Sequence, residues 1–226
     1  MKTYLECIPC FFKQALDAAR LAKANEKTKK RIMCELAAIL PKFSLDASPP
    51  EMGMIIYRLV RNATGKKDPY KEIKDKSNKF ALKFYPLLKE KIRCAKDPLL
   101  TSIELAIAGN IIDYGVKNTL NVDKELKKIL QEEDKIIKNE NKQLFCYKGF
   151  KDTLKMANAI LYLGDNAGEI VFDKILIEEI KSINKGADII YAVKEKPIIN
   201  DALKQDAYFC VIDKIARVIS NGLDAP

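Results

Sequence analysis

Apolar residues in the first half of the chain recur at close to the 3.6-residue spacing of an amphipathic helix. Prolines or short polar stretches separate successive runs, as at Pro41, Ser48-Pro-Pro50 and Asp97-Pro98. Ser48 is a candidate N-cap, with the prolines near the helix start. The pattern predicts helices over 11–24, 29–40, 51–63, 68–92 and 99–112. We therefore predict a helical subdomain over residues 1–120, with no strand before about residue 144.

The second half alternates between short apolar runs and helical patterns. After a charged helix beyond Asn121 and a short strand over 144–147, strands are predicted over 160–163, 188–193 and 217–220. Helices are predicted over 151–157, 169–183 and 201–208. Such alternation is typical of a parallel sheet with crossover helices. We predict an α/β fold, with a mainly parallel sheet in an α/β core over residues 121–226.

Polar residues follow each predicted strand. Asp165 and Asn166 lie in the loop between the strand 160–163 and the helix that starts at Glu169. Asp201 follows the second strand by a loop, and Asn221 follows the third. The carboxyl ends of parallel strands meet at one sheet edge, where helix N-termini also favour anions. Hard oxygen donors such as Asp165 and Asn166 suit Mg²⁺ or Mn²⁺ holding a phosphate.

Simpler roles remain open for these residues. Asp165 and Asp201 could each cap the helix that follows. Glu169 in a first helical turn is favourable to the helix dipole whatever its chemistry. Asn221 could serve only the turn before Gly222.

Composition narrows the chemistry. The 226 residues are 48% hydrophobic and 31% charged, with a net charge of +9, but lysines alternate with acids and no arginine-rich tract indicates nucleic acid. No apolar run approaches a membrane span, so we expect a cytoplasmic protein that does not bind membranes. The oligomeric state is left open. The chain has no histidine, which excludes Ser-His and Cys-His catalysis and any zinc site that uses histidine.

Six cysteines are too few for a disulfide scaffold in a chain of this size. Cys7 and Cys10 form a Cys-x-x-Cys pair, and no second pair at that spacing exists to complete a zinc site. Inert thiols, a metal pair and a redox pair all remain open for these two residues.

Several motifs in a fixed order resemble the DUF89 family, the metal-dependent damage-control phosphatases. They cover nearly the whole chain, and the N-terminal cysteine pair resembles the largely prokaryotic branch. The motifs are Cys7-x-x-Cys10 with Gln14, Asp68-Pro-Tyr70, Gly109-Asn-Ile-Ile-Asp113, Gly164-Asp-Asn-Ala-Gly-Glu169, Lys196-Pro-Ile-Ile-Asn-Asp201 and Ser220-Asn-Gly222.

The resemblance implies a helical subdomain packed on a Rossmann-like α/β core, with a divalent metal (Mg, Mn, Co or Ni) at the strand ends. By motif, the metal ligands would be Asp165, Asn166 and Asp201. Activity in the family is hydrolysis of phosphate esters of small metabolites, including sugar phosphates. The residues expected to contact substrate are Asn110, Asp113, Asn200, Ser220 and Asn221.

Without histidine, the proton transfer falls to Asp165, Glu169 or Asp201. Attack by water and an aspartyl-phosphate intermediate both remain open. The family continues beyond the Ser-Asn-Gly loop into a lysine-bearing loop that contacts phosphate, whereas this sequence stops at Pro226, so we expect a C-terminally incomplete core.

Two other functions compete with the phosphatase. A non-catalytic phosphometabolite- or nucleotide-binding protein would use the same site. A methyltransferase would need a Gly-x-Gly-rich loop after the strand 160–163, and the sequence has none there.

Overall fold

The computed structural model describes residues 2–109 and 146–222. The chain divides into two compact units, one formed by Met1–Glu72, Lys194–Asp201 and Gly222–Pro226 and the other by Ile73–Val193 and Ala202–Asn221. The domain boundary predicted near residue 120 lies outside the described residues and stays a prediction.

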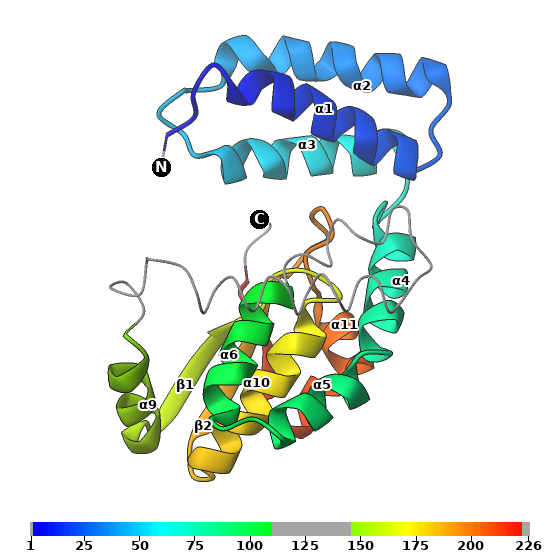
Figure 1. Ribbon diagram of the computed structural model, residues 1–226. Helices are drawn as coiled ribbons and strands as arrows, with labels where there is room; N and C mark the ends of the chain where they lie inside the picture. The colour runs from blue at the N-terminus through cyan, green and yellow to red at the C-terminus, as the bar shows by residue number, and fades with distance from the viewer. Residues whose placement is uncertain (1, 110–145, 223–226) are drawn as a thin grey trace. The chain divides into compact units, whose positions relative to one another are not determined.

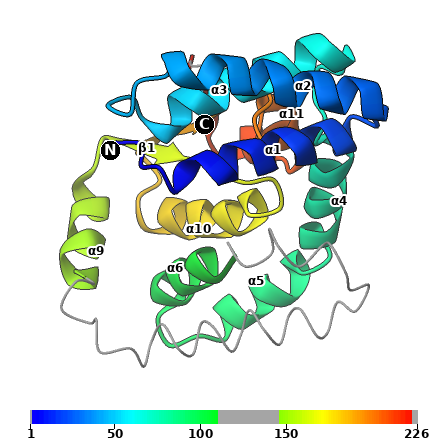
Figure 2. The ribbon, with the colours of Figure 1, turned by 90° about the horizontal axis from the view of Figure 1, so that it is seen from above.

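Three helices form the body of the first unit: α1 (Cys7–Leu21), α2 (Glu26–Ile39) and α3 (Pro49–Thr64). They lie side by side (Figures 1 and 2) around a shared apolar core. The helix α3 begins as the sequence predicts, because the Glu51 carboxylate accepts hydrogen bonds from the Ser48 backbone N–H and hydroxyl at 2.6 and 3.2 Å. A short 3-10 helix, η1 (Leu40–Lys42), follows α2.

The helix α4 (Lys71–Leu82) starts at the end of the first unit and lies mostly in the second, which continues with α5 (Tyr85–Arg93) and α6 (Pro98–Gly109). After the undescribed segment come α9 (Tyr147–Met156), β1 (Ala159–Leu163), α10 (Ile170–Ile183), β2 (Asp188–Val193), α11 (Lys204–Phe209), η3 (Ile212–Lys214) and β3 (Arg217–Ser220). Most predicted elements are therefore confirmed to within a few residues.

Three predictions were wrong. The single helix expected over 68–92 is divided into α4, which ends at Leu82, and α5, which begins at Tyr85 with Pro86 in its first turn. Tyr147, expected in a short strand, is the first residue of α9, while residues 144 and 145 lie outside the described part. The helix expected from Asp201 begins only at Lys204, because the Asp206 carboxylate accepts a hydrogen bond from the Leu203 N–H at 2.9 Å. The charged helix expected beyond Asn121 also lies outside the described residues.

The three strands form a parallel sheet in the order β1-β2-β3. Ala159 pairs with Asp188 at the start of β1, and Val193 pairs with Ser220 at the end of β3. This small parallel sheet among many helices confirms the predicted mixed α/β class. The finer Rossmann-like arrangement stays a prediction.

The helix α10 packs between the sheet and α6, and α5 lies beside α10 and α6 (Figures 1 and 2). The helices α6 and α10 approach closely at Gly109 of α6, where an added Cβ would lie 2.6 Å from the ring of Phe172 in α10. The buried face of α10 is almost entirely apolar, and it includes Ile170, Val171 and Ile175. Burial of this face against the sheet fixes where the helix begins, directly after the loop that follows β1.

One polar group interrupts the apolar contact between α10 and the sheet. The buried Asp173 carboxylate accepts hydrogen bonds from the Tyr162 hydroxyl of β1 and the Tyr191 hydroxyl of β2, both at 2.6 Å. The two rings stack with centroids 5.5 Å apart. Burial raises the pKa of Asp173 from 3.8 to about 6, although the two hydroxyl hydrogen bonds act in the opposite direction.

This carboxyl makes the stability of the apoprotein depend on pH. Between about pH 4 and pH 6 the native state keeps a proton that the unfolded state has released, so the free energy of unfolding falls as pH rises. For Asp173→Asn we expect the free energy of unfolding, relative to wild type, to increase by about 2–3 kcal/mol from pH 4 to pH 7. Urea unfolding in EDTA measures this difference.

Asp46→Asn is the matched control, because that carboxylate is exposed and pairs with the exposed Lys2 at 2.7 Å. The free energy of unfolding of Asp46→Asn, relative to wild type, should change by less than about 0.5 kcal/mol between pH 4 and pH 7. A flat difference for Asp173→Asn would contradict a raised pKa at this carboxyl.

Candidate functional site

The loop after β1 is shaped by two glycines. The Gly164 N–H donates to the Ala192 carbonyl at 2.9 Å, and a Cβ at Gly164 would collide with the Tyr191 ring. Gly168 has a φ of +90°, and a Cβ there would lie 3.1 Å from the side chain of Ser77. Both positions therefore require glycine, one for close packing and the other also for its backbone conformation.

The loop places an amide between two carboxylates. Asn166 donates from Nδ2 to Asp165 Oδ2 at 3.1 Å and to Glu169 Oε2 at 3.2 Å. Asp165 is exposed, whereas Glu169 is half-buried at the start of α10. The structure thus brings together three of the predicted site residues.

Neither aspartate caps a helix, so that alternative is wrong for both. The N-cap of α10 is Glu169, and the N-cap of α11 is Leu203. The Asp165 backbone carbonyl instead accepts a hydrogen bond from the Ala202 N–H at 2.6 Å. The Asp165 side chain therefore accepts its hydrogen bond from Asn166 and not from a helix N-terminus.

Negative charge accumulates where α10 begins. Burial, together with the nearby charges of Asp173 and Asp165, raises the pKa of Glu169 to about 7, against the hydrogen bonds from Asn166. Within residues 2–109 and 146–222, no lysine or arginine forms an ion pair with Asp165 or Glu169. This carboxylate group therefore lacks a compensating cation from the described chain.

The loop after β2, Lys194–Asp201, belongs to the helical unit. Arg61 of α3 donates from Nη1 to the Pro197 carbonyl at 3.0 Å, and Ile198 is buried in the core of α1, α2 and α3. The helices thus hold this loop through its backbone at Pro197 and through the apolar side chains of Ile198 and Ile199.

Asn200 and Asp201 at the end of this loop are both buried, at 8% and 5% exposure. The Lys194 ammonium lies 3.5 Å from the Asp201 carboxylate. Sequence reasoning did not single out Lys194, although its place directly after β2 was a usable signal. The convergence of Asp201 with Asp165 stays a prediction.

At the end of β3, the Asn221 N–H donates to the Val193 carbonyl at 2.8 Å, which extends the parallel pairing by one residue. Ser220 is half-buried and Asn221 exposed. The predicted substrate contacts Asn110 and Asp113 lie outside the described residues. Asp173 was also missed, because its helical spacing placed it among apolar residues.

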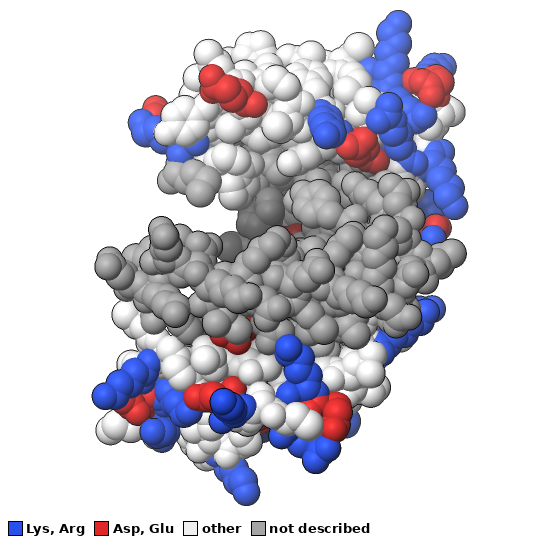
Figure 3. Space-filling model, in the orientation of Figure 1, with Lys and Arg blue, Asp and Glu red and all other residues white. Residues whose placement is uncertain are grey.

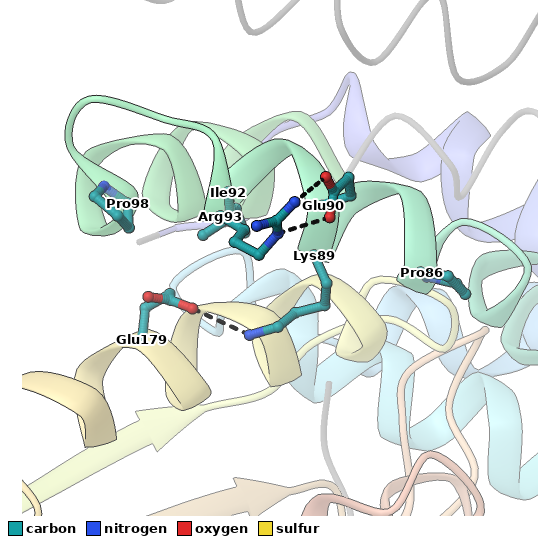
Figure 4. A pocket seen from close by; sticks show the side chains of 7 residues that line it. All are labelled: Pro86, Lys89, Glu90, Ile92, Arg93, Pro98 and Glu179. Atoms are coloured by element: carbon teal, nitrogen blue, oxygen red, sulfur yellow. Dashed lines mark hydrogen bonds and ion pairs between the residues drawn. The ribbon is translucent and has the colours of Figure 1, made fainter.

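A pocket elsewhere on the surface has no such excess of one charge. This pocket of about 490 Å³ opens beside α5 (Figure 4), lined by Pro86, Lys89, Glu90, Ile92, Arg93, Pro98 and Glu179. Lys89 lies 3.1 Å from Glu179, and Arg93 Nε donates to Glu90 at 2.9 Å. The charges of this pocket therefore neutralise one another. Basic and acidic side chains also lie interspersed over the face in Figure 3.

Cys7 and Cys10 are free thiols in the first turn of α1. Among the residues that the structure describes, no three His, Cys, Asp or Glu side chains have the arrangement of a metal site. The three interpretations of the cysteine pair stay open. No helix in the described ranges is long and apolar enough to cross a membrane.

Comparison with known proteins places these features in a family. The family model described as the damage-control phosphatase ARMT1-like domain matches residues 3–226. An uncharacterized protein of Methanocaldococcus jannaschii is 38% identical over 97% of this chain and 71% of its own length.

Two further relatives carry the name damage-control phosphatase. The one from Pyrococcus horikoshii is 34% identical over 98% of this chain and 74% of its own length. The one from Archaeoglobus fulgidus is 33% identical over 100% of this chain and 76% of its own length. The crystal structure of a DUF89 family protein from P. horikoshii, 31% identical, superposes with a TM-score of 0.85 and covers 100% of this chain and 75% of that one. The chain therefore belongs to the DUF89 family of damage-control phosphatases with an ARMT1-like domain.

Proposed function

We propose that this protein is a metal-dependent phosphatase that hydrolyses phosphate monoesters of small metabolites, such as sugar phosphates. The observation that carries the proposal is the group of Asp165, Asn166 and Glu169 at the carboxyl end of β1. The Asn166 amide donates to the two carboxylates at 3.1 and 3.2 Å, and neither carboxylate has a cation among its described neighbours. Relatives named damage-control phosphatases support the reaction class.

The residues of this loop fit a hard divalent cation. Carboxylate and amide oxygens are the donors that Mg²⁺ and Mn²⁺ prefer, and Co²⁺ and Ni²⁺ accept them as well. Asn166 turns its Nδ2 toward both carboxylates, which leaves its Oδ1 as an acceptor. Asp165 and Asn166 would hold the cation, with Asp201 as the third ligand that the family motif indicates.

Each residue then has a defined task. The bound cation would neutralise charge on the phosphoryl oxygens and provide a Lewis acid. Asp165 and Asn166 would orient it at the strand end. The Glu169 carboxyl, whose pKa is raised to about 7, can hold or release a proton near neutral pH in a chain that has no histidine. The N-terminus of α10 would favour the phosphate by its dipole.

Removal of one ligand should abolish the activity without unfolding the protein. Wild type should release phosphate from sugar phosphates and an aryl phosphate with Mg²⁺, Mn²⁺, Co²⁺ or Ni²⁺ but not with EDTA. We expect Asp165→Asn to lower metal-dependent release by at least about 100-fold, because one carboxylate ligand is lost. Phosphate assays and circular dichroism measure the two properties.

Asp152→Asn is the matched control, because that exposed carboxylate only pairs with Lys155 on α9 at 3.1 Å. It should retain wild-type turnover. Activity retained in Asp165→Asn would refute the site. Saturable binding of phosphometabolites without release under any cation would instead favour a non-catalytic binding protein.

Glu169 should act on the proton rather than on the cation. We expect Glu169→Gln, which keeps the hydrogen bond from Asn166 but cannot exchange a proton, to lower kcat by about 100- to 10,000-fold. The concentration of Mn²⁺ that gives half-maximal activity should stay within about threefold of wild type. A large rise in that concentration with unchanged kcat would make Glu169 a metal ligand instead.

A further inference from the structure

A buried asparagine far away in the sequence contacts the loop after β1. Asn78 lies in α4 and is 1% exposed. Its Oδ1 accepts a hydrogen bond from the Gly168 N–H at 2.7 Å, and its Nδ2 donates to Asp206 Oδ1 at 2.9 Å. One amide therefore joins the end of the loop to the carboxylate of α11.

Asp206 continues this network. Its Oδ2 accepts the Leu203 N–H at 2.9 Å, and the ammonium of Lys74 lies 3.8 Å from the same oxygen. Lys74 and Asp206 are 0% and 2% exposed, so the network is shielded from water. Buried polar groups of this kind stay stable only when each finds a partner, which fixes the geometry of all of them.

The network joins the two chain segments that carry the proposed ligands. Gly168 ends the loop of Asp165 and Asn166. Leu203 lies two residues after Asp201 in the sequence. The residue between them, Ala202, donates from its N–H to the Asp165 carbonyl at 2.6 Å. Asn78 and Asp206 thus fix the backbone on both sides of the hydrogen bond between Ala202 and Asp165.

The amide is specific to this task. Gly168 needs an acceptor and Asp206 needs a donor, and the Asn78 side chain offers one of each in a fixed plane. An aspartate at this position would place a carboxylate against Asp206. An alanine would leave the Gly168 N–H and one Asp206 oxygen without this partner.

We propose that Asn78 is a positioning residue for the proposed metal site. Its amide holds the loop Gly164–Gly168 against the segment Leu203–Asp206, and this contact sets the direction in which Asp165 and Asn166 present their oxygens. The inference rests on the proposed function, because it concerns the cation that these oxygens would bind.

The test compares two asparagines. Asn184 makes a similar set of bonds in the same unit, donating to the carbonyls of Leu154 and Ala157 at 2.9 and 2.8 Å and accepting from Gly186 at 3.2 Å. It lies beyond the other end of α10, before β2. Asn184→Ala therefore removes a comparable structural amide without touching the loop after β1.

Isothermal titration of each apoprotein with Mn²⁺ alone gives the main readout. We expect Asn78→Ala to weaken Mn²⁺ binding by at least about tenfold and Asn184→Ala by less than twofold. Amide hydrogen exchange of Gly168, followed by NMR, should become at least about tenfold faster only in Asn78→Ala, because its acceptor is removed. Thermal unfolding of both variants reports the structural cost.

An exchange of charge supplies a second test that keeps the network intact. Asn78→Asp should weaken Mn²⁺ binding by at least about tenfold through repulsion at Asp206. In the double variant N78D/D206N the new amide at position 206 can donate to the new carboxylate at position 78, so the hydrogen bond returns with its direction reversed. One carboxylate remains near Lys74. The Mn²⁺ affinity of the double variant should return to within about threefold of wild type. If Asn78→Ala does not fold, this pair decides the matter.

The outcomes are distinct. Unchanged Mn²⁺ affinity in Asn78→Ala, an equal loss in Asn184→Ala, or no recovery in the folded double variant would overturn the positioning role alone. Absence of both Mn²⁺ binding and phosphate release in the wild type would overturn the proposed function and this inference with it.

Discussion

The parallel pairing of β1 with β2 is the constraint on which the rest of the second unit depends. Because paired parallel strands need a crossover, α10 must run back along the sheet, and its apolar face is buried against it. The loop after β1 must then turn sharply into α10 at the carboxyl edge of the sheet. Gly164 and Gly168 meet that demand, one by close contact with Tyr191 and the other by its positive φ.

The same geometry concentrates negative charge. Asp165, Glu169 and Asp173 follow one another at intervals of four residues from the loop into α10, and the charges of Asp165 and Asp173 both raise the pKa of Glu169. Asp173 obtains two tyrosine hydroxyls as donors, but a hydrogen bond leaves its charge in place. Glu169 accepts its hydrogen bonds from Asn166, whose side-chain amide also donates to Asp165. Ionisation of all three carboxyls is unfavourable for folding alone, and a bound cation would relieve the repulsion between them.

Much of this arrangement is local and could be predicted from the sequence. Branched residues bounded by polar turns gave β2 and β3 at the residues where they occur, and β1 to within one residue. Asp165, Asn166 and Glu169 were found because neighbours in the sequence remain neighbours in a short loop. Tyr147 was misplaced, because a short apolar run does not separate a strand from the first turn of a helix.

What the sequence could not reveal depends on contacts between distant segments. The helical pattern of α4 places Asn78 on an ordinary helix, and nothing nearby indicates that its amide meets a glycine of the loop after β1. Asp173 and Asp206 are likewise hidden, because their partners are a pair of tyrosines on two strands and an amide on α4.

Charge balance separates the candidate site from the rest of the surface. In the pocket beside α5, Lys89 and Arg93 each have a carboxylate partner, so an anion or cation that enters must break an existing pair. At the end of β1 the described chain supplies carboxylates to Asn166 but no cation to Asp165 or Glu169. A positively charged ligand at the end of β1 would therefore form the ion pairs with Asp165 and Glu169 that the described chain does not form itself. Structural ion pairs are already complete, whereas a binding site keeps part of its electrostatic energy for the ligand.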